Sequence, residues 1–253
     1  MARMTDFAVA SAAATDTGIV RKQNEDAYLA RPEIGLWVVA DGMGGHDDGQ
    51  LASNAIVQAL EAMAEPVDGT SFIGEVRARL ADVNDQLVAT AAARDGHAVI
   101  GSTVVALMTF GRFFACLWAG DSRLYQFRHG RLAQVTHDHS QVQEMVDAGL
   151  LTPDQAENHP LGNVITRAVG VGPVLELDKV SDPLEQDDIF LLCSDGLFKA
   201  MEDATVARIL DESTFEEVPR TLIDAALAGG SKDNVTVVVV RIGPEKTAVT
   251  NFG

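Results

Sequence analysis

Hydrophobic and polar positions follow two different periods in separate blocks of this chain. Runs that are apolar throughout or alternate with polar residues, and that are rich in β-branched and aromatic residues, predict strands. The predicted strands are "FAVASAAA" (7–14), "LWVVAD" (36–41), "GSTVVALMTFG" (101–111), "RFFACLWAGD" (112–121), "RLYQFRHGRLAQVT" (123–136), "DIFLLCSD" (188–195) and "NVTVVVVRI" (234–242). The letters "RHG" inside the fifth run predict a hairpin turn.

Helical periodicity appears in two pairs of consecutive segments, one early and one late. These segments are residues 49–65, 72–95, 203–213 and 214–230, and the last one is predicted to end at Gly229–Gly230. Strands and helices therefore come in blocks and not in strict β-α-β alternation. This order predicts an α+β fold of stacked antiparallel sheets with helices on the outside.

The chain has no internal repeat and no linker-like tract, which predicts a single domain. We place this domain at residues 1–245, followed by a tail at 246–253. Residues 137–167 interrupt the strand pattern with a short amphipathic helix that stops at Gly149, a second helix start at Thr152–Pro153, and a loop. Such an insertion is either a lid near a site or a packing appendage.

Composition narrows the class of protein. Hydrophobic residues make up 47% of the chain, and the net charge is −18, so we expect a folded core and no binding to nucleic acid or anionic membranes. The sequence contains no run of about 18 apolar residues, so we expect no membrane-spanning helix. Cys116 and Cys193 lie inside apolar runs and are interpreted as buried thiols, not as a disulfide or a metal pair. We expect a monomer in the reducing cytoplasm.

Aspartates recur where predicted strands end or begin. Asp41, Asp121 and Asp195 each close an apolar run beside a glycine, and Asp233 directly precedes another. Any one of them is explained by ordinary turn chemistry. Four together predict convergence, and converging carboxylates in a dry site need positive charge between them.

Divalent cations are the natural partners of such a cluster, because no group of Lys or Arg accompanies it in the sequence. Oxygen donors without thiolates or a His pair favour Mg²⁺ or Mn²⁺ over zinc. We expect Asp41 to bridge two ions, and Gly42 to let its bare carbonyl reach one of them. A hydroxide held between two such ions is a good nucleophile.

A second polar group lies in "GIVRKQNEDAYLA" (18–30). The guanidinium of Arg21 matches a phosphoryl group in shape. Glu25 and Asp26 are candidates for holding metal-bound waters. The alternative is a solvated charged turn. No Walker loop, EF-hand string or Gly-x-Ser-x-Gly elbow is present.

Six motifs then occur in an order and spacing that resembles a known family: "RKQNEDA", "VVADGMGGH", "GSTVVAL", "AGDSRLY", "LLCSDGL" and "KDNVTVVVV". They resemble the metal-dependent serine/threonine protein phosphatases of the PPM (PP2C) type, and the bacterial single-domain branch in particular. The resemblance spans about residues 7–242.

This resemblance implies a four-layer α-β-β-α sandwich in which helix pairs flank two antiparallel sheets and residues 137–167 form the flap. It also implies that Asp41 bridges two Mn²⁺ or Mg²⁺ ions, and that the Gly42 carbonyl, Asp195 and Asp233 are the other ligands of these ions. Asp121 is implied to bind a weaker third ion together with Asp195. Arg21 matches the phosphate-binding arginine. The implied activity is hydrolysis of phosphoserine and phosphothreonine in proteins by a metal-bridging hydroxide, opposing a bacterial Ser/Thr kinase.

The resemblance departs from many eukaryotic members at one position. They have a histidine directly after the Asp-Gly pair, whereas this chain has Met43 there and its histidine at His46. His46 or a metal-bound water is then the donor of the leaving-group proton. We interpret His137 and His139 as capping residues of the flap, and His97, His129 and His159 as structural. The competing hypothesis is a non-catalytic phosphoprotein-binding or regulatory module with the same fold.

Overall fold

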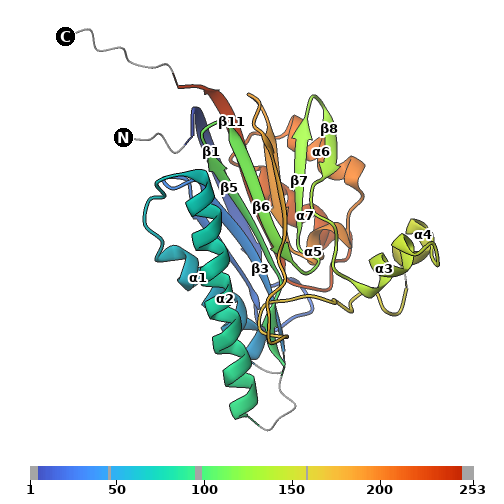
Figure 1. The fold of residues 1–253 in the computed structure, drawn as a ribbon. Helices are drawn as coiled ribbons and strands as arrows, with labels where there is room; N and C mark the ends of the chain where they lie inside the picture. The colour runs from blue at the N-terminus through green and yellow to red at the C-terminus, as the bar shows by residue number, and fades with distance from the viewer. Residues whose placement is uncertain (1–4, 45–46, 95–98, 158, 247–253) are drawn as a thin grey trace.

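The computed structural model describes residues 5–44, 47–94, 99–157 and 159–246. Two antiparallel sheets stack face to face, and helices cover the outer face of each (Figure 1). The predicted α-β-β-α sandwich is confirmed. Within the described residues, no helix is both long and apolar enough to cross a membrane.

Every predicted strand is present, and all strand pairs within the two sheets are antiparallel. The first sheet has the order β1 (Phe7–Asp16), β11 (Val235–Glu245), β10 (Ile189–Cys193), β7 (Arg123–Arg128) and β8 (Arg131–Gln134). The second has the order β2 (Asp26–Arg31), β3 (Leu36–Gly44), β5 (Val104–Phe110), β6 (Phe113–Ala119) and β9 (Asp178–Pro183), with β4 (Ile100–Ser102) pairing with β3.

The continuous apolar runs are explained by burial on both faces of each sheet. In β3, Val38 faces the core under the early helices, whereas Trp37 and Val39 face the layer between the sheets. In β11, Val237 faces the late helices and Val238 faces the other sheet. Successive side chains point to opposite faces of a strand, so a strand in the middle of four layers needs apolar residues at every position.

The helices form the two predicted pairs, with an extra short turn. The early pair is α1 (Asp48–Glu61) and α2 (Gly69–Ala93), and the late group is α5 (Asp195–Phe198), α6 (Asp203–Glu212) and α7 (Val218–Ala228). Helix α2 begins three residues earlier than predicted because Asp68 caps it by accepting hydrogen bonds from the backbone N–H groups of Thr70 and Ser71. Helix α7 ends as predicted, at Gly229.

The insertion at 137–167 contains α3 (Gln141–Asp147) and α4 (Pro153–Glu157), which project from the sandwich (Figure 1). Gly149 follows α3 with a φ of +70°, as its predicted role as a stop requires. Strand β9 was not predicted. Its sequence "DKVSDP" carries little hydrophobic signal, because it is a largely exposed edge strand that pairs only with β6 along the sheet.

Candidate metal centre

The sandwich brings the predicted aspartates to one of its ends. Asp26 begins β2 and stands opposite Asp41 in the register of β2 with β3. Asp121 follows β6, Asp195 is the first residue of α5 after β10, and Asp233 precedes β11. In an antiparallel sheet the start of one strand lies beside the end of its neighbour. Segments that are distant in the sequence therefore bring their carboxylates to the same end of the sandwich.

Burial and the closeness of these carboxylates raise the pKa values of three of them. Burial raises the pKa of Asp41 well above its usual value, and the charges of Asp26, Asp195, Asp121 and Asp233 raise it further. Burial and the neighbouring aspartates likewise raise the pKa of Asp26 to about 7, against hydrogen bonds that lower it. The pKa of Asp121 also rises to about 7, by burial and then by the charge of Asp195.

Backbone and hydroxyl contacts fix Asp41 in place. Its N–H donates to the Thr103 hydroxyl at 3.0 Å, and the N–H of Thr103 donates back to the Asp41 carbonyl at 2.9 Å. The Thr103 hydroxyl also lies 2.7 Å from the Ser122 hydroxyl. The "GST" and "GDS" motifs therefore form one support beneath Asp41 and Asp121.

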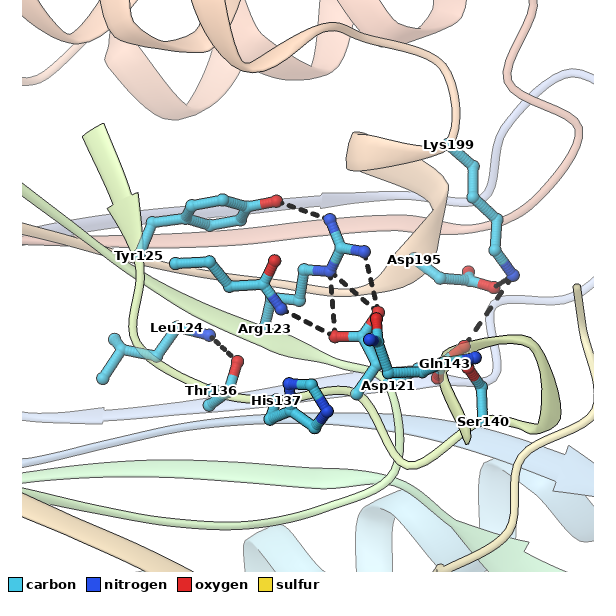
Figure 2. A network of polar contacts seen from close by, with 12 residues as sticks. Asp121, Arg123, Leu124, Tyr125, Thr136, His137, Ser140, Gln143, Asp195 and Lys199 are labelled. Carbon is cyan, nitrogen blue, oxygen red and sulfur yellow. Dashed lines mark hydrogen bonds and ion pairs between the residues drawn. The ribbon is translucent and has the colours of Figure 1, made fainter. Parts of the chain in front are cut away.

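Two cations of the chain contact these carboxylates. The guanidinium of Arg21 donates to the Asp233 carboxylate at 2.7 Å, so the predicted phosphate-binding arginine does lie at the cluster. The ammonium of Lys199 lies 2.5 Å from Asp195 and 3.8 Å from Asp121 (Figure 2). Lys199 was not predicted from the sequence, although its spacing four residues after Asp195 on a helical turn was a usable signal.

The residues present fit divalent cations. The Oδ1 atom of Asp195 is buried and has no hydrogen-bond partner within residues 5–44, 47–94, 99–157 and 159–246, which in a native site calls for a further ligand. The donors are carboxylate oxygens, the preferred ligands of Mg²⁺ and Mn²⁺. In the part of the chain that the structure describes, no three His, Cys, Asp or Glu side chains are arranged to hold one ion as they stand. Asp233 and Asp195 face Arg21 and Lys199 instead.

Gly42 has a packing role that the sequence analysis did not anticipate. A Cβ atom there would lie 2.1 Å from the Gly49 carbonyl oxygen and 2.6 Å from that of Glu25. The absence of a side chain thus lets β3, the start of α1 and the loop before β2 meet at the site. Glu25 lies against Gly49, and burial raises its pKa while Arg21 opposes that rise. The roles expected of the Gly42 carbonyl and of Glu25 stay predictions.

Asn234 and Ser194 position the site and were also missed. The buried Asn234 side chain accepts from the Glu25 N–H at 2.8 Å and donates to the carbonyls of Thr17 (2.8 Å) and Gln23 (3.0 Å). The Ser194 hydroxyl donates to Asp26 at 2.7 Å. Asn234 therefore holds the loop that carries Arg21. Its only sequence signal was its place directly after Asp233.

The base of the flap is held by buried polar contacts, and the interpretation of His139 as a capping residue is wrong. His139 is buried against the Trp118 ring, accepts from the Gly120 N–H at 3.2 Å, and contacts Asp178 at 3.2 Å. Ser140 caps α3 instead, by accepting from the Gln143 N–H.

His137 pairs with Asp147 at 2.7 Å and is no cap either. Between the two histidines, Asp138 accepts hydrogen bonds from the guanidinium of Arg123, which lies 3.6 Å from the centroid of the Phe198 ring. The flap base is therefore bound to β7 and α5.

His129 lies in the hairpin turn, as predicted, and His159 in the flap loop. Cys116 and Cys193 are both buried and free, as predicted. His46, His97 and residues 247–253 of the tail lie outside the described residues, so the candidate for the leaving-group proton donor stays a prediction.

Comparison with known proteins adds a family to this geometry. A family model described as "Protein phosphatase 2C" matches residues 19–228. The serine/threonine protein phosphatase PstP of Mycobacterium tuberculosis is 36% identical over 242 residues, which cover 96% of this chain and 46% of the relative. The chain thus spans about half the length of that relative.

Solved structures agree with the fold. PppA of Pseudomonas aeruginosa, described as a key regulatory component of T6SS, is 44% identical with a TM-score of 0.86, covering 92% of this chain and 97% of the other. The catalytic domain of PstP in complex with two manganese ions is 34% identical with a TM-score of 0.84, covering 93% and 99%.

Proposed function

This chain belongs to the protein phosphatase 2C family, and on that basis we propose that it hydrolyses phosphoserine and phosphothreonine in proteins with the help of two Mn²⁺ or Mg²⁺ ions. The observation that carries the proposal is the convergence of five aspartates at one end of the sandwich. Asp26 stands opposite Asp41, and Asp121 and Asp195 share the ammonium of Lys199. The fifth, Asp233, binds the guanidinium of Arg21. A relative with 34% identity contains two manganese ions.

The residues have distinct tasks in this proposal. Asp41, Asp195, Asp233 and the Gly42 carbonyl would hold the ions, while Glu25 and Asp26 would orient the water around them. When bound, the ions would neutralise the charge of the phosphoryl oxygens and lower the pKa of water at the site, which favours in-line attack on phosphorus. In a chain of net charge −18, the positive charge of the ions is what makes the site attractive to an anionic substrate.

Arg21 binds and orients the phosphoryl group. Its guanidinium reaches the cluster while its side chain is 49% exposed, so it is open to a substrate from solvent. Asp233 fixes one of its nitrogens at 2.7 Å and leaves other donors for phosphate oxygens. Positioning and charge neutralisation, with no covalent phosphoenzyme, then account for catalysis.

Phosphorylated proteins are the proposed substrates, including a bacterial Ser/Thr kinase and its targets, because the relatives are named serine/threonine protein phosphatases. We propose a cytoplasmic monomer, in keeping with two buried free thiols. The flap is the surface we assign to substrate choice, since its loop contacts the cluster through Lys199 and Asn163.

Hydrolysis of a phosphothreonine peptide and of p-nitrophenyl phosphate tests this function. Both reactions should require Mn²⁺, stop with EDTA, and fall at least a hundredfold in Asp195→Asn, whose unpartnered Oδ1 is assigned to an ion. The competing hypothesis is a non-catalytic phosphoprotein-binding module of the same fold. Phosphopeptide binding without turnover at any Mn²⁺ concentration would establish it.

A further inference from the structure

Lys199 projects from the end of helix α5 into the gap between two site carboxylates and the flap (Figure 2). Its Nζ atom lies 2.5 Å from Asp195 Oδ2, 3.8 Å from Asp121 Oδ2, and 2.7 Å from the amide oxygen of Asn163. One ammonium therefore contacts two segments of the sandwich and the loop of the flap that contains Asn163.

The position needs a cation. The side chains of Asp121 and Asp195 are only 7% and 15% exposed, so water screens their repulsion poorly. The ammonium of Lys199 lies within ion-pair distance of both carboxylates and supplies the positive charge that this buried pair needs.

The two oxygens of the Asp195 carboxylate have different surroundings. Oδ2 accepts the hydrogen bond from Lys199, whereas Oδ1 is buried and has no hydrogen-bond partner among the described residues. Oδ1 is available to a divalent ion while Oδ2 keeps its lysine. Asp121 shares this lysine, and a further ion bridging Asp121 and Asp195 would meet the ammonium between them.

The contact with Asn163 extends this arrangement to the flap. Asn163 lies in a tight turn in which the Val164 N–H donates to Leu161, and the Val164 carbonyl accepts from Gln141 at the start of α3. No residue of α3 is buried, so packing contributes little to holding this part. A hydrogen bond to a charged group is then a substantial part of what fixes the loop.

We propose that Lys199 is a built-in cation that takes the place of a third metal ion between Asp121 and Asp195 and fastens the flap to the metal centre through Asn163. The proposal rests on the proposed function insofar as it assumes a two-ion site beside the lysine. It replaces the expectation, drawn from the family resemblance, of a weaker third ion at Asp121.

Two measurements on Lys199→Met test the two parts of the proposal, the replacement of a third ion and the attachment of the flap. Native mass spectrometry with increasing Mn²⁺ should count two ions on the unchanged chain and a third, weaker one on the variant. Hydrogen–deuterium exchange of the metal-free protein should show flap residues 159–165 exchanging about tenfold faster or more in the variant, the effect of losing one charge-assisted hydrogen bond. Lys179→Met, on edge strand β9, removes the same charge as a control and should change neither.

Asn163→Ala separates the flap contact from the charge. It should speed flap exchange as Lys199→Met does, while the number of bound ions stays at two. Three ions on the unchanged chain, no additional ion on Lys199→Met, or an unaltered flap exchange rate in that variant would each overturn the proposal. A chain that binds no Mn²⁺ would count against the proposed function instead, and the exchange experiment, which needs no ion, would still decide whether Lys199 holds the flap.

Discussion

Asp26 and Asp41 stand directly opposite each other across strands β2 and β3. Residues in this relationship have Cβ atoms about 5 Å apart, and like charges there repel. Burial raises the pKa of both carboxyls, and the charge of Asp26 raises that of Asp41. The fold therefore maintains an unfavourable pair at the centre of the proposed site.

Relieving this repulsion should stabilise the metal-free protein. In Asp41→Asn we expect the Tm without metal to rise by a few degrees, because a buried charge among like charges is removed. The stabilisation of the unchanged protein by Mn²⁺, roughly 5–10 °C at a hundredfold excess over Kd, should be lost. Differential scanning calorimetry with and without Mn²⁺ measures both. Asp85→Asn, on the exposed face of α2, is the control. If Mn²⁺ raises the Tm of Asp41→Asn as much as that of the unchanged protein, Asp41 is not a metal ligand.

Arg21 should be sensitive to shape as well as charge. Arg21→Lys keeps the positive charge but replaces the planar guanidinium with a single ammonium, so we expect KM for a phosphopeptide to rise about tenfold. Steady-state kinetics at saturating Mn²⁺ check this. Lys22→Ala removes a neighbouring exposed cation and should leave KM within about twofold. An unchanged KM in Arg21→Lys would mean that Arg21 serves only to hold Asp233.

Asn234 should control the order of the loop that bears Arg21. Asn234→Ala removes three hydrogen bonds to Glu25, Thr17 and Gln23, and at about 1 kcal/mol each we expect roughly 2–4 kcal/mol of lost stability. Amide exchange in residues 17–25 should quicken more than elsewhere. Asn54→Ala on α1, which loses one hydrogen bond within its helix, is the matched control. Equal protection of 17–25 in both variants would refute this role.

His139 should make the stability of the protein depend on pH. Burial lowers the pKa of His139, with Arg167 and His137 acting in the same direction and Asp178 opposing them. The contribution of the neutral His139 side chain to the free energy of unfolding is complete above the pKa of histidine in the unfolded chain, about 6.5. As pH falls below it, the unfolded chain takes up a proton first, so the free energy of unfolding decreases.

Urea unfolding at pH 7.5 and 5.5 measures this effect. Asp26 and Asp121, whose pKa values are raised to about 7, act in the opposite direction over this range, so the test is a difference between variants. The free energy of unfolding at pH 5.5, relative to that at pH 7.5, should be higher in His139→Gln than in the unchanged protein. The comparison variant His129→Asn, in the exposed hairpin turn, should match the unchanged protein, and a match in His139→Gln as well would mean that His139 is not responsible.

The sequence was informative where one residue type has one physical explanation. Unbroken apolar runs such as residues 235–240 require burial on both faces, which is why the stacked sheets could be predicted. Aspartates placed where apolar strands end are costly without a cation, which is why Asp41, Asp121, Asp195 and Asp233 could be predicted as a cluster from the sequence. Strand β9 escaped because an exposed edge strand needs no apolar pattern.

The chain's own sequence thus determined the layers and the set of carboxylates, because burial and charge are properties of residue types and of their local spacing. Only the tertiary structure decided which cation meets which carboxylate. Most of these contacts join segments that are distant in the sequence. They are the contacts of Lys199 with Asp121, of Asn234 with the loop that carries Arg21, and of Arg123 with Asp138. The contact of Lys199 with Asp195, four residues earlier, is the exception. Such contacts depend on the relative placement of strand ends and loops, which local patterns do not encode.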